Sequence, residues 1–170
     1  MLGVASQLFV ENGPDVPFTE IAKKAGVGVG TVYRHFPTRE ALISAAYASE
    51  LDAVCQAAAE LLAQMPPAAA LRAWMGRFID YMTMKIGLTA AIQSVVAAGG
   101  NPYARSRERL DEALEVLLGA MVATGEARPE VPADDVLMTL SGIAMAAGAP
   151  EQREQAERMV DLLVAGILVR

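Results

Sequence analysis

Residues 18–39 read FTEIAKKAGVGVGTVYRHFPTR, and this stretch decides the fold more than any other part of the chain. Its pattern predicts two short helices joined by a glycine turn, which is the layout of a helix-turn-helix. Gly26 stands where the first helix ends and the chain reverses, a position that favours positive φ. Ala22 and Val32 are placed to let the two helices pack closely. We therefore predict a helix-turn-helix motif at about residues 18–37.

The two ends of this motif carry separate signals. Thr19 is predicted to cap the first helix through its hydroxyl. Pro37 is predicted to stop the second helix, because proline disfavours helical geometry in the residue before it. Thr38 can then cap a third helix that begins at Arg39. The second helix carries four side chains suited to contact with DNA, where such a helix enters the major groove: Thr31, Tyr33, Arg34 and His35.

Residues 25–42, AGVGVGTVYRHFPTREAL, resemble the TetR family of bacterial transcriptional regulators, and residues 5–13 and 18–22 match the first two helices of the same pattern. Residues 71–81 and 132–170 are more loosely similar to the regulatory half of one actinobacterial-looking branch. The resemblance implies an all-α protein with two domains. Residues 1–41 would form a three-helix DNA-binding domain, and residues 42–170 a helical bundle that binds a ligand and forms a homodimer.

Residue roles follow from the resemblance position by position. Family members usually touch the sugar-phosphate backbone at the positions of Thr19, Thr31, Tyr33, His35 and Arg39. They usually read base edges at the positions of Gly28, Val29, Gly30 and Arg34. Members often have serine and lysine where this chain has Gly28 and Val29, which leaves the base-reading role of position 29 open, although valine can pack on a thymine methyl group. The basic lead-in common in the family is absent before Leu2, so either the natural chain starts earlier or that contact is missing.

Charge divides the chain unevenly. The whole sequence carries a net charge of −6, which alone argues against general affinity for nucleic acid. Up to residue 40, four basic residues balance four acidic ones, and the remaining ten basic and sixteen acidic residues account for the −6. A neutral module with its basic groups around one helix can still dock on phosphates. Because four basic residues are few for a tight site, two modules side by side are expected.

Composition excludes several other classes. An apolar content of 54 % indicates a folded, helix-rich body, and no run approaches the roughly 18 to 20 apolar residues of a membrane span. No secretory leader is visible, so we expect a cytoplasmic protein. Cys55 is the only cysteine and His35 the only histidine, so we expect no metal site and no cofactor. We expect Cys55 to be a buried thiol, and an intermolecular disulfide or a redox sensor is the alternative.

The body beyond the motif shows helical periodicity throughout. It predicts helices at 39–64, 67–86, 88–98, 102–124, 133–147 and 151–169. The last two helices carry apolar and small side chains that favour a four-helix interface between two copies of the chain. The alternative is that these faces pack inside one subunit. The residues predicted to line this interface are Val136, Leu137, Leu140, Ile143, Ala144 and Met145 on one helix, and Met159, Leu162, Leu163, Ala165, Gly166 and Ile167 on the other.

A ligand cavity is expected in the middle of the body, where aromatic, methionine and polar residues are mixed. An ordinary core is the alternative for each of these residues. The candidates are Trp74, Phe78, Tyr81, Met82, Gln93 and Met121.

Together with these patterns, the resemblance implies a TetR-like DNA-binding regulator, a repressor that a small-molecule ligand releases from a palindromic operator. An enzyme is not expected, since the only histidine lies in the reading helix and no phosphate-binding glycine loop appears. A helical binding module whose DNA-binding part has decayed is the remaining alternative.

Overall fold

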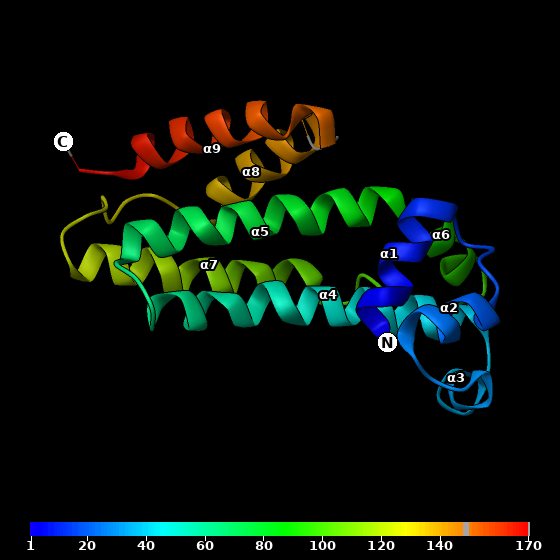
Figure 1. Cartoon of the computed structure of the whole chain (residues 1–170). Coiled ribbons are helices and arrows are strands. Elements are labelled where there is room, and N and C mark those ends of the chain that lie inside the picture. Colours follow the sequence, from blue (N-terminus) through cyan, green and yellow to red (C-terminus); the bar gives the residue numbers. More distant parts are fainter. Residues whose placement is uncertain (148–149, 170) are drawn as a thin grey trace. The chain divides into compact units, whose positions relative to one another are not determined.

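The computed structural model describes residues 1–147 and 150–169 of the chain, and this part is built from helices (Figure 1). Residues 148–149 and 170, which fall in the predicted second domain, lie outside the described residues. Within the described part, the only β pairing is an isolated bridge between Ala127 and Leu168. The predicted all-α fold class is confirmed. The elements are α1 (Leu2–Asn12), α2 (Phe18–Ala25), α3 (Val29–His35), α4 (Arg39–Leu62), α5 (Pro67–Gly87), α6 (Thr89–Ala97), α7 (Ser106–Ala123), α8 (Ala133–Ala147), the 3₁₀ turn η1 (Pro150–Gln152) and α9 (Arg153–Ile167).

The helices gather into two compact units. Unit 1 comprises Met1–Asp52 and Met84–Ala104, and unit 2 comprises Ala53–Thr83 and Arg105–Arg170. The long helices α4 and α5 therefore contribute to both units. Unit 1 contains α1, α2 and α3, which we call the headpiece, and it also contains α6.

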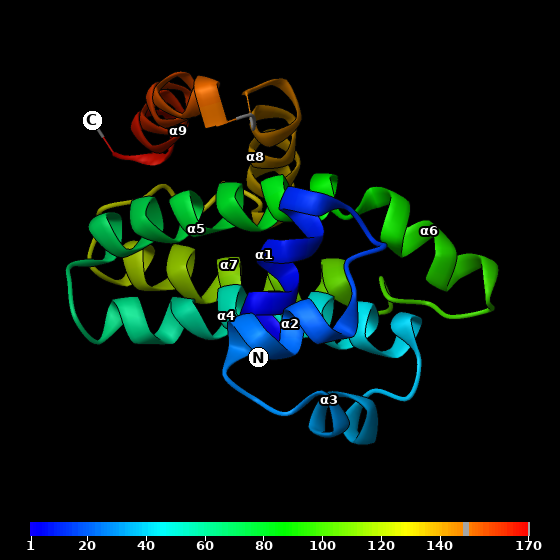
Figure 2. The same cartoon turned by 45° about the vertical axis from the view of Figure 1, so that its right-hand side comes forward.

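In the headpiece α2 lies between α1 and α3 (Figure 2). Its core consists of side chains with no exposed surface from each helix, including Phe9, Ile21 and Val32. Helix α1 also lies against the end of α5, since a Cβ added to Gly87 would stand 3.1 Å from Cγ1 of Val10. A small core thus fixes the headpiece within unit 1.

Unit 2 has its core among α4, α5 and α7. The Trp74 side chain has no exposed surface and its Nε1 donates to the carbonyl oxygen of Val54 at 2.8 Å. Helix α8 packs on α7 and on α9. Helix α9 is tied to α5 by an ion pair between Arg72 and Asp161, with 2.7 Å between Nε and Oδ1, and by a second pair between Arg153 and Asp80. The α8–α9 hairpin is therefore part of unit 2 and not a separate appendage.

Most predicted helix ends are correct to within two residues, and two local predictions are wrong. Helix α7 begins at Ser106 and not at residue 102, because Arg105 adopts the left-handed conformation with φ of 58°, which a helix cannot contain. Thr19 does not cap α2, since the helix already begins at Phe18 with Pro17 in the cap position. The predicted cap by Thr38 is confirmed, because its Oγ1 accepts from the Ala41 amide at 3.1 Å.

Candidate nucleic-acid interface

The turn between α2 and α3 has the geometry that the sequence predicts. Gly26 ends α2 in the left-handed conformation, with φ of 68°, and its amide donates back to the Ala22 and Lys23 carbonyls. Gly28 is extended and opens α3. Ala22 and Val32, which are 3 % and 0 % exposed, face the core. Because Val32 is anchored inward, the opposite face of α3 is held outward.

That outward face carries the side chains predicted to read DNA. Tyr33 is 56 % exposed, and Arg34 and His35 are exposed beside it. The Tyr33 ring packs on Phe18 of α2, with 4.9 Å between ring centroids. Nη2 of Arg34 donates to Oγ1 of Thr31 at 3.3 Å. The helix therefore presents one aromatic, one guanidinium and one imidazole group on a single short surface.

The N-terminal end of α3 carries only small side chains, and its residues are exposed. Gly28, Val29 and Gly30 are exposed, with Val29 at 38 %. A Cβ added to Gly30 would meet no atom within 4 Å. The small residues leave room for the backbone of this turn to approach a surface closely, which suits contact with base edges.

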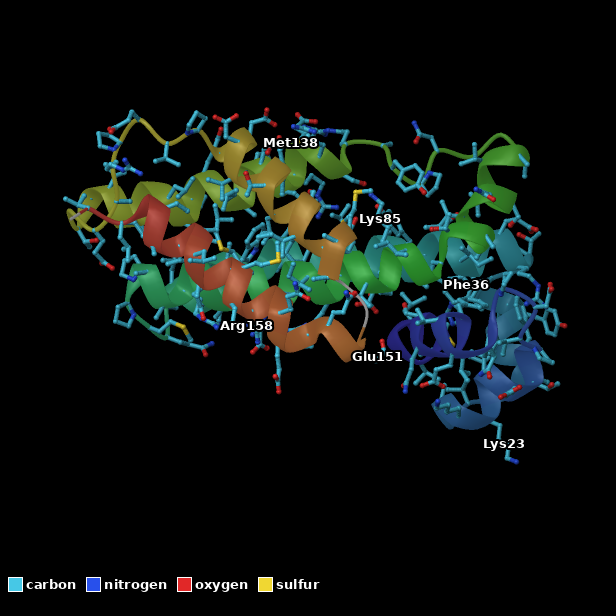
Figure 3. All side chains as sticks on the ribbon, turned by 90° about the horizontal axis from the view of Figure 1, so that it is seen from above. Lys23, Phe36, Lys85, Met138, Glu151 and Arg158 are labelled. Atoms are coloured by element: carbon cyan, nitrogen blue, oxygen red, sulfur yellow. The ribbon has the colours of Figure 1, made fainter. Side chains whose placement is uncertain are left out.

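Helix α2 adds a polar edge to this surface. Thr19, in the first turn, is exposed, as are Lys23 and Lys24 in the last turn (Lys23 is labelled in Figure 3). Nζ of Lys24 pairs with Glu11 of α1 at 3.4 Å. The pKa of Glu11 is lowered, first by a hydrogen bond from Gln7 and further by Lys24. Part of the positive charge of α2 is therefore neutralised within the headpiece.

Arg39 has a structural role that the sequence did not reveal. Its Nη1 donates to the carbonyl oxygens of Pro14 and Val16, at 2.5 and 2.7 Å, and its guanidinium lies 5.6 Å from the centre of the Phe18 ring. The start of α4 is thereby tied to the loop between α1 and α2. The predicted contact of Arg39 with the DNA backbone stays a prediction.

Phe18 was missed as a site residue. It is 6 % exposed, and its ring contacts both the Tyr33 ring and the Arg39 guanidinium. These two partners are fifteen and twenty-one positions away in the sequence, so no local pattern predicts the stack. Phe18 supports two of the side chains predicted to contact DNA.

The predicted ligand residues divide between the two units. Trp74, Phe78, Tyr81 and Met121 are buried in unit 2, where the rings of Trp74 and Phe78 stack with centroids 5.7 Å apart. Met82 is half-buried in unit 2, and Gln93 is exposed on α6 of unit 1. The four buried side chains form core contacts, and their role toward a ligand stays a prediction.

The dimer prediction is corrected in part. Five of the residues predicted for the interface on α8 are buried inside their own unit: Val136, Leu137, Leu140, Ile143 and Ala144. On α9, Ile167 is also buried, at 2 % exposed. Two of the predicted interface residues, Met145 and Leu162, are exposed at 76 and 75 %, and Met138, which was not predicted, is exposed at 54 %. A groove of about 370 Å³ beside Leu162 is bordered by Val136 of α8 and Gly166 of α9.

Other classes of site find little support in the described part of the chain. No cluster of three potential metal ligands occurs among residues 1–147 and 150–169. None of the described helices is both long and apolar enough to cross a membrane. Cys55 is half-buried, and its Sγ donates to the Arg109 carbonyl oxygen at 3.6 Å.

Comparison with known proteins identifies both parts of the chain. Residues 1–46 match the family described as bacterial regulatory proteins, tetR family, and residues 66–169 match that of the transcriptional regulator SbtR-like C-terminal domain. No curated protein matches at a significant level.

Solved structures give the same result. A TetR transcriptional regulator from Streptomyces coelicolor is 48 % identical and superposes with a TM-score of 0.95, over 98 % of this chain and 95 % of that one. A TetR regulatory protein from Mycobacterium vanbaalenii is 30 % identical with a TM-score of 0.79, over 99 % and 92 % of the two chains. A TetR-family regulator from Agrobacterium tumefaciens, at 18 % identity and a TM-score of 0.70 over 99 % and 95 %, shares the fold.

Proposed function

The chain belongs to the TetR family of transcriptional regulators, and from this premise we propose that it is a repressor that binds a palindromic operator as a homodimer and is released by a small-molecule ligand. The observation that carries the proposal is the outward face of α3, where Tyr33, Arg34 and His35 are exposed while Val32 is buried. We further propose residues 1–41 as the DNA-binding domain and residues 42–170 as the regulatory domain, acting in the cytoplasm, where operator DNA lies.

Each proposed DNA contact has a specific chemistry. Arg34 is suited to donate two hydrogen bonds to a guanine edge, and Val29 can pack on a thymine methyl group. Thr31, Tyr33 and His35 can donate to phosphate oxygens, as can Thr19 from α2. Gly28 and Gly30 permit close approach of the backbone. Arg39 contributes by holding the end of the α1–α2 loop, in addition to its predicted backbone contact.

Dimerisation is proposed through α8 and α9. Met138, Met145 and Leu162 are exposed apolar side chains of this hairpin, and large exposed apolar patches are typical of protein–protein interfaces. Exposed Ala165 and Gly166 would allow close packing of the two copies. A two-fold axis through this contact would present two α3 helices to two half-sites.

Selection of bound sequences from random double-stranded DNA tests the central part of the proposal. We expect an enriched palindrome whose half-sites are separated by about one helical turn, roughly 10 base pairs, or a multiple of it. Enrichment of a single half-site would contradict the dimer, and the absence of any enriched sequence would contradict operator recognition.

Release by a ligand needs a separate measurement. Trp74 is the only tryptophan of the chain and is fully buried, so its fluorescence reports on the region predicted to bind the ligand. A ligand that binds the DNA-free form more tightly must lower operator affinity by the same factor, typically about 5- to 150-fold. A compound that changes Trp74 fluorescence saturably and leaves operator affinity unchanged would not be the releasing ligand. If no compound in a broad library releases the operator, the release mechanism fails while DNA binding stands.

A further inference from the structure

Lys85 is a half-buried cation without an acidic partner. It lies in the last turn of α5 and belongs to unit 1 (Figure 3). Its Nζ stands 5.0 Å from the centre of the Tyr103 ring. Among the described residues its side chain forms no ion pair and donates no hydrogen bond, so the aromatic ring is the partner of its charge.

The chain has twenty acidic residues and fourteen basic ones, so carboxylates are in surplus. Arg72 pairs with Asp161, and Arg153 pairs with both Asp80 and Glu157. These half-buried arginines are matched by carboxylates, whereas Lys85 is not, although carboxylates are in surplus. Lys85 differs from these two arginines in that an aromatic ring, and no carboxylate, lies beside its charge among the described residues.

The ring beside Lys85 is held firmly in place. Tyr103 contacts Tyr47 edge-to-face, with centroids 5.7 Å apart and an angle of 85° between the ring planes, and Tyr47 is only 1 % exposed. The loop that carries Tyr103 turns at Gly99, with φ of 87°, and packs tightly at Gly100, where an added Cβ would lie 2.7 Å from Cγ1 of Val95. Tyr103 itself is 40 % exposed, so part of its ring is open to a ligand.

The protein's own groups do not fully stabilise the charge. The face of an aromatic ring attracts a cation, and the C-terminal end of a helix dipole adds a further favourable interaction. Burial nevertheless lowers the pKa of Lys85. Burial, with a smaller effect of Tyr47, raises the pKa of Tyr103, so its phenol stays neutral and supplies no negative charge. An anion brought by a ligand would supply what is missing.

We propose that Lys85 and Tyr103 bind the carboxylate of a small organic acid, with Nζ donating to the carboxylate and the exposed part of the Tyr103 ring packing on the apolar part of the molecule. A carboxylate can accept from the ammonium at short range, and charge-assisted hydrogen bonds of this kind are about twice as strong as neutral ones. Binding of a carboxylate at this site does not require DNA. The carboxylate site and the proposed operator binding can therefore be tested, and refuted, separately.

Benzoate is a suitable probe, with benzamide as its uncharged analogue of similar shape. The chain has only three lysines, Lys23, Lys24 and Lys85, so the ¹³Cε signals of labelled lysine are few and can be assigned by substitution. At constant ionic strength and without DNA, we expect benzoate to shift the Lys85 signal saturably and to leave Lys23 and Lys24 unmoved. We expect no saturable shift with benzamide.

Substitutions distinguish the effect of the Lys85 charge on benzoate binding from an effect on folding. We expect Lys85→Gln to weaken benzoate binding about tenfold or more, measured by calorimetry, and Lys85→Arg to retain most of it. Tyr103→Ala should weaken binding as well, while circular dichroism verifies that each variant is folded. Equal shifts of all three lysines, equal shifts with benzamide, or unchanged affinity in folded Lys85→Gln would each overturn the proposal.

Discussion

Replacing Arg39 by alanine removes the tie between the start of α4 and the loop that precedes α2. The variant loses the two hydrogen bonds from Nη1 to the Pro14 and Val16 carbonyls and the contact with the Phe18 ring. Hydrogen bonds from a charged donor contribute about 1.5 to 3 kcal/mol each when desolvated, and a cation–π contact about 0.5 to 1 kcal/mol at a partly exposed site. Because the guanidinium is half-buried, we take the low end and expect a loss of about 2 to 4 kcal/mol.

Amide hydrogen exchange is the assay, because it reports the stability of the headpiece separately from that of unit 2. A loss of about 2 to 4 kcal/mol predicts that exchange of protected amides in α1 and α2 accelerates about 30- to 900-fold. Protected amides of α7 in unit 2 should exchange at nearly the wild-type rate. Arg39→Lys keeps the positive charge but not the planar guanidinium, so its exchange rates in α1 and α2 should lie between those of wild type and those of Arg39→Ala.

The same variant distinguishes the two roles of Arg39. If the guanidinium acts on protein carbonyls, the dependence of DNA affinity on salt concentration should be unchanged in Arg39→Ala. A variant with wild-type exchange rates, and with a salt slope smaller by about one for each subunit, would show instead that Arg39 serves DNA phosphates. That result would refute the positioning role.

Three further predictions concern other parts of the chain. Leu162→Glu should dissociate the proposed dimer in analytical ultracentrifugation, because Leu162 is 75 % exposed and the new charge would lie in the proposed α8–α9 interface. Val116→Glu on α7, where the side chain is 53 % exposed, should leave the oligomeric state unchanged, and dissociation by both variants would contradict this interface. Gly26→Ala should lower the free energy of unfolding by about 1 kcal/mol in urea denaturation, because φ is 68° and an L-residue is strained in this left-handed conformation. The added Cβ meets no atom within 4 Å, so no steric clash adds to this loss, and an unchanged stability would contradict the left-handed turn. The pKa of Lys85, followed by its ¹³Cε signal, should lie below the ordinary lysine value, because burial disfavours the charged form. As the pH rises through this lowered pKa, the folded state holds fewer protons than the unfolded state, so the free energy of unfolding increases with pH. An ordinary or raised pKa would contradict the burial of the ammonium group.

Local signals predicted the headpiece well. Gly26, Val32 and Pro37 each act within a few residues of their own position, through backbone conformation, side-chain burial or steric exclusion. The structure places Gly26 in the left-handed region, buries Val32 and ends α3 at His35. Such effects can be inferred from the sequence because they involve only neighbours in the chain.

Tertiary effects were not predictable in the same way. The stack of Arg39, Phe18 and Tyr33 joins three separate helices, and nothing in the spacing of these residues indicates that they meet. The left-handed conformation of Arg105, which delays α7, occurs at a residue type that rarely adopts it. On α8, periodicity correctly indicated an apolar face, but it could not tell whether that face packs against the same chain or against a second copy.

The salt-dependent affinity of the selected operator for wild-type protein and for Arg34→Ala tests the central claim most directly. Wild-type affinity should fall steeply as salt is raised, because phosphate contacts release bound counterions. Arg34→Ala should lose about 1 to 3 kcal/mol of binding free energy for each half-site and discriminate bases less well at the position that it reads. Arg77→Ala, on α5 in unit 2 and away from the proposed dimer interface, is the matched control and should bind as wild type. Salt-insensitive binding by the wild type, or equal losses in the two variants, would contradict recognition of DNA through α3.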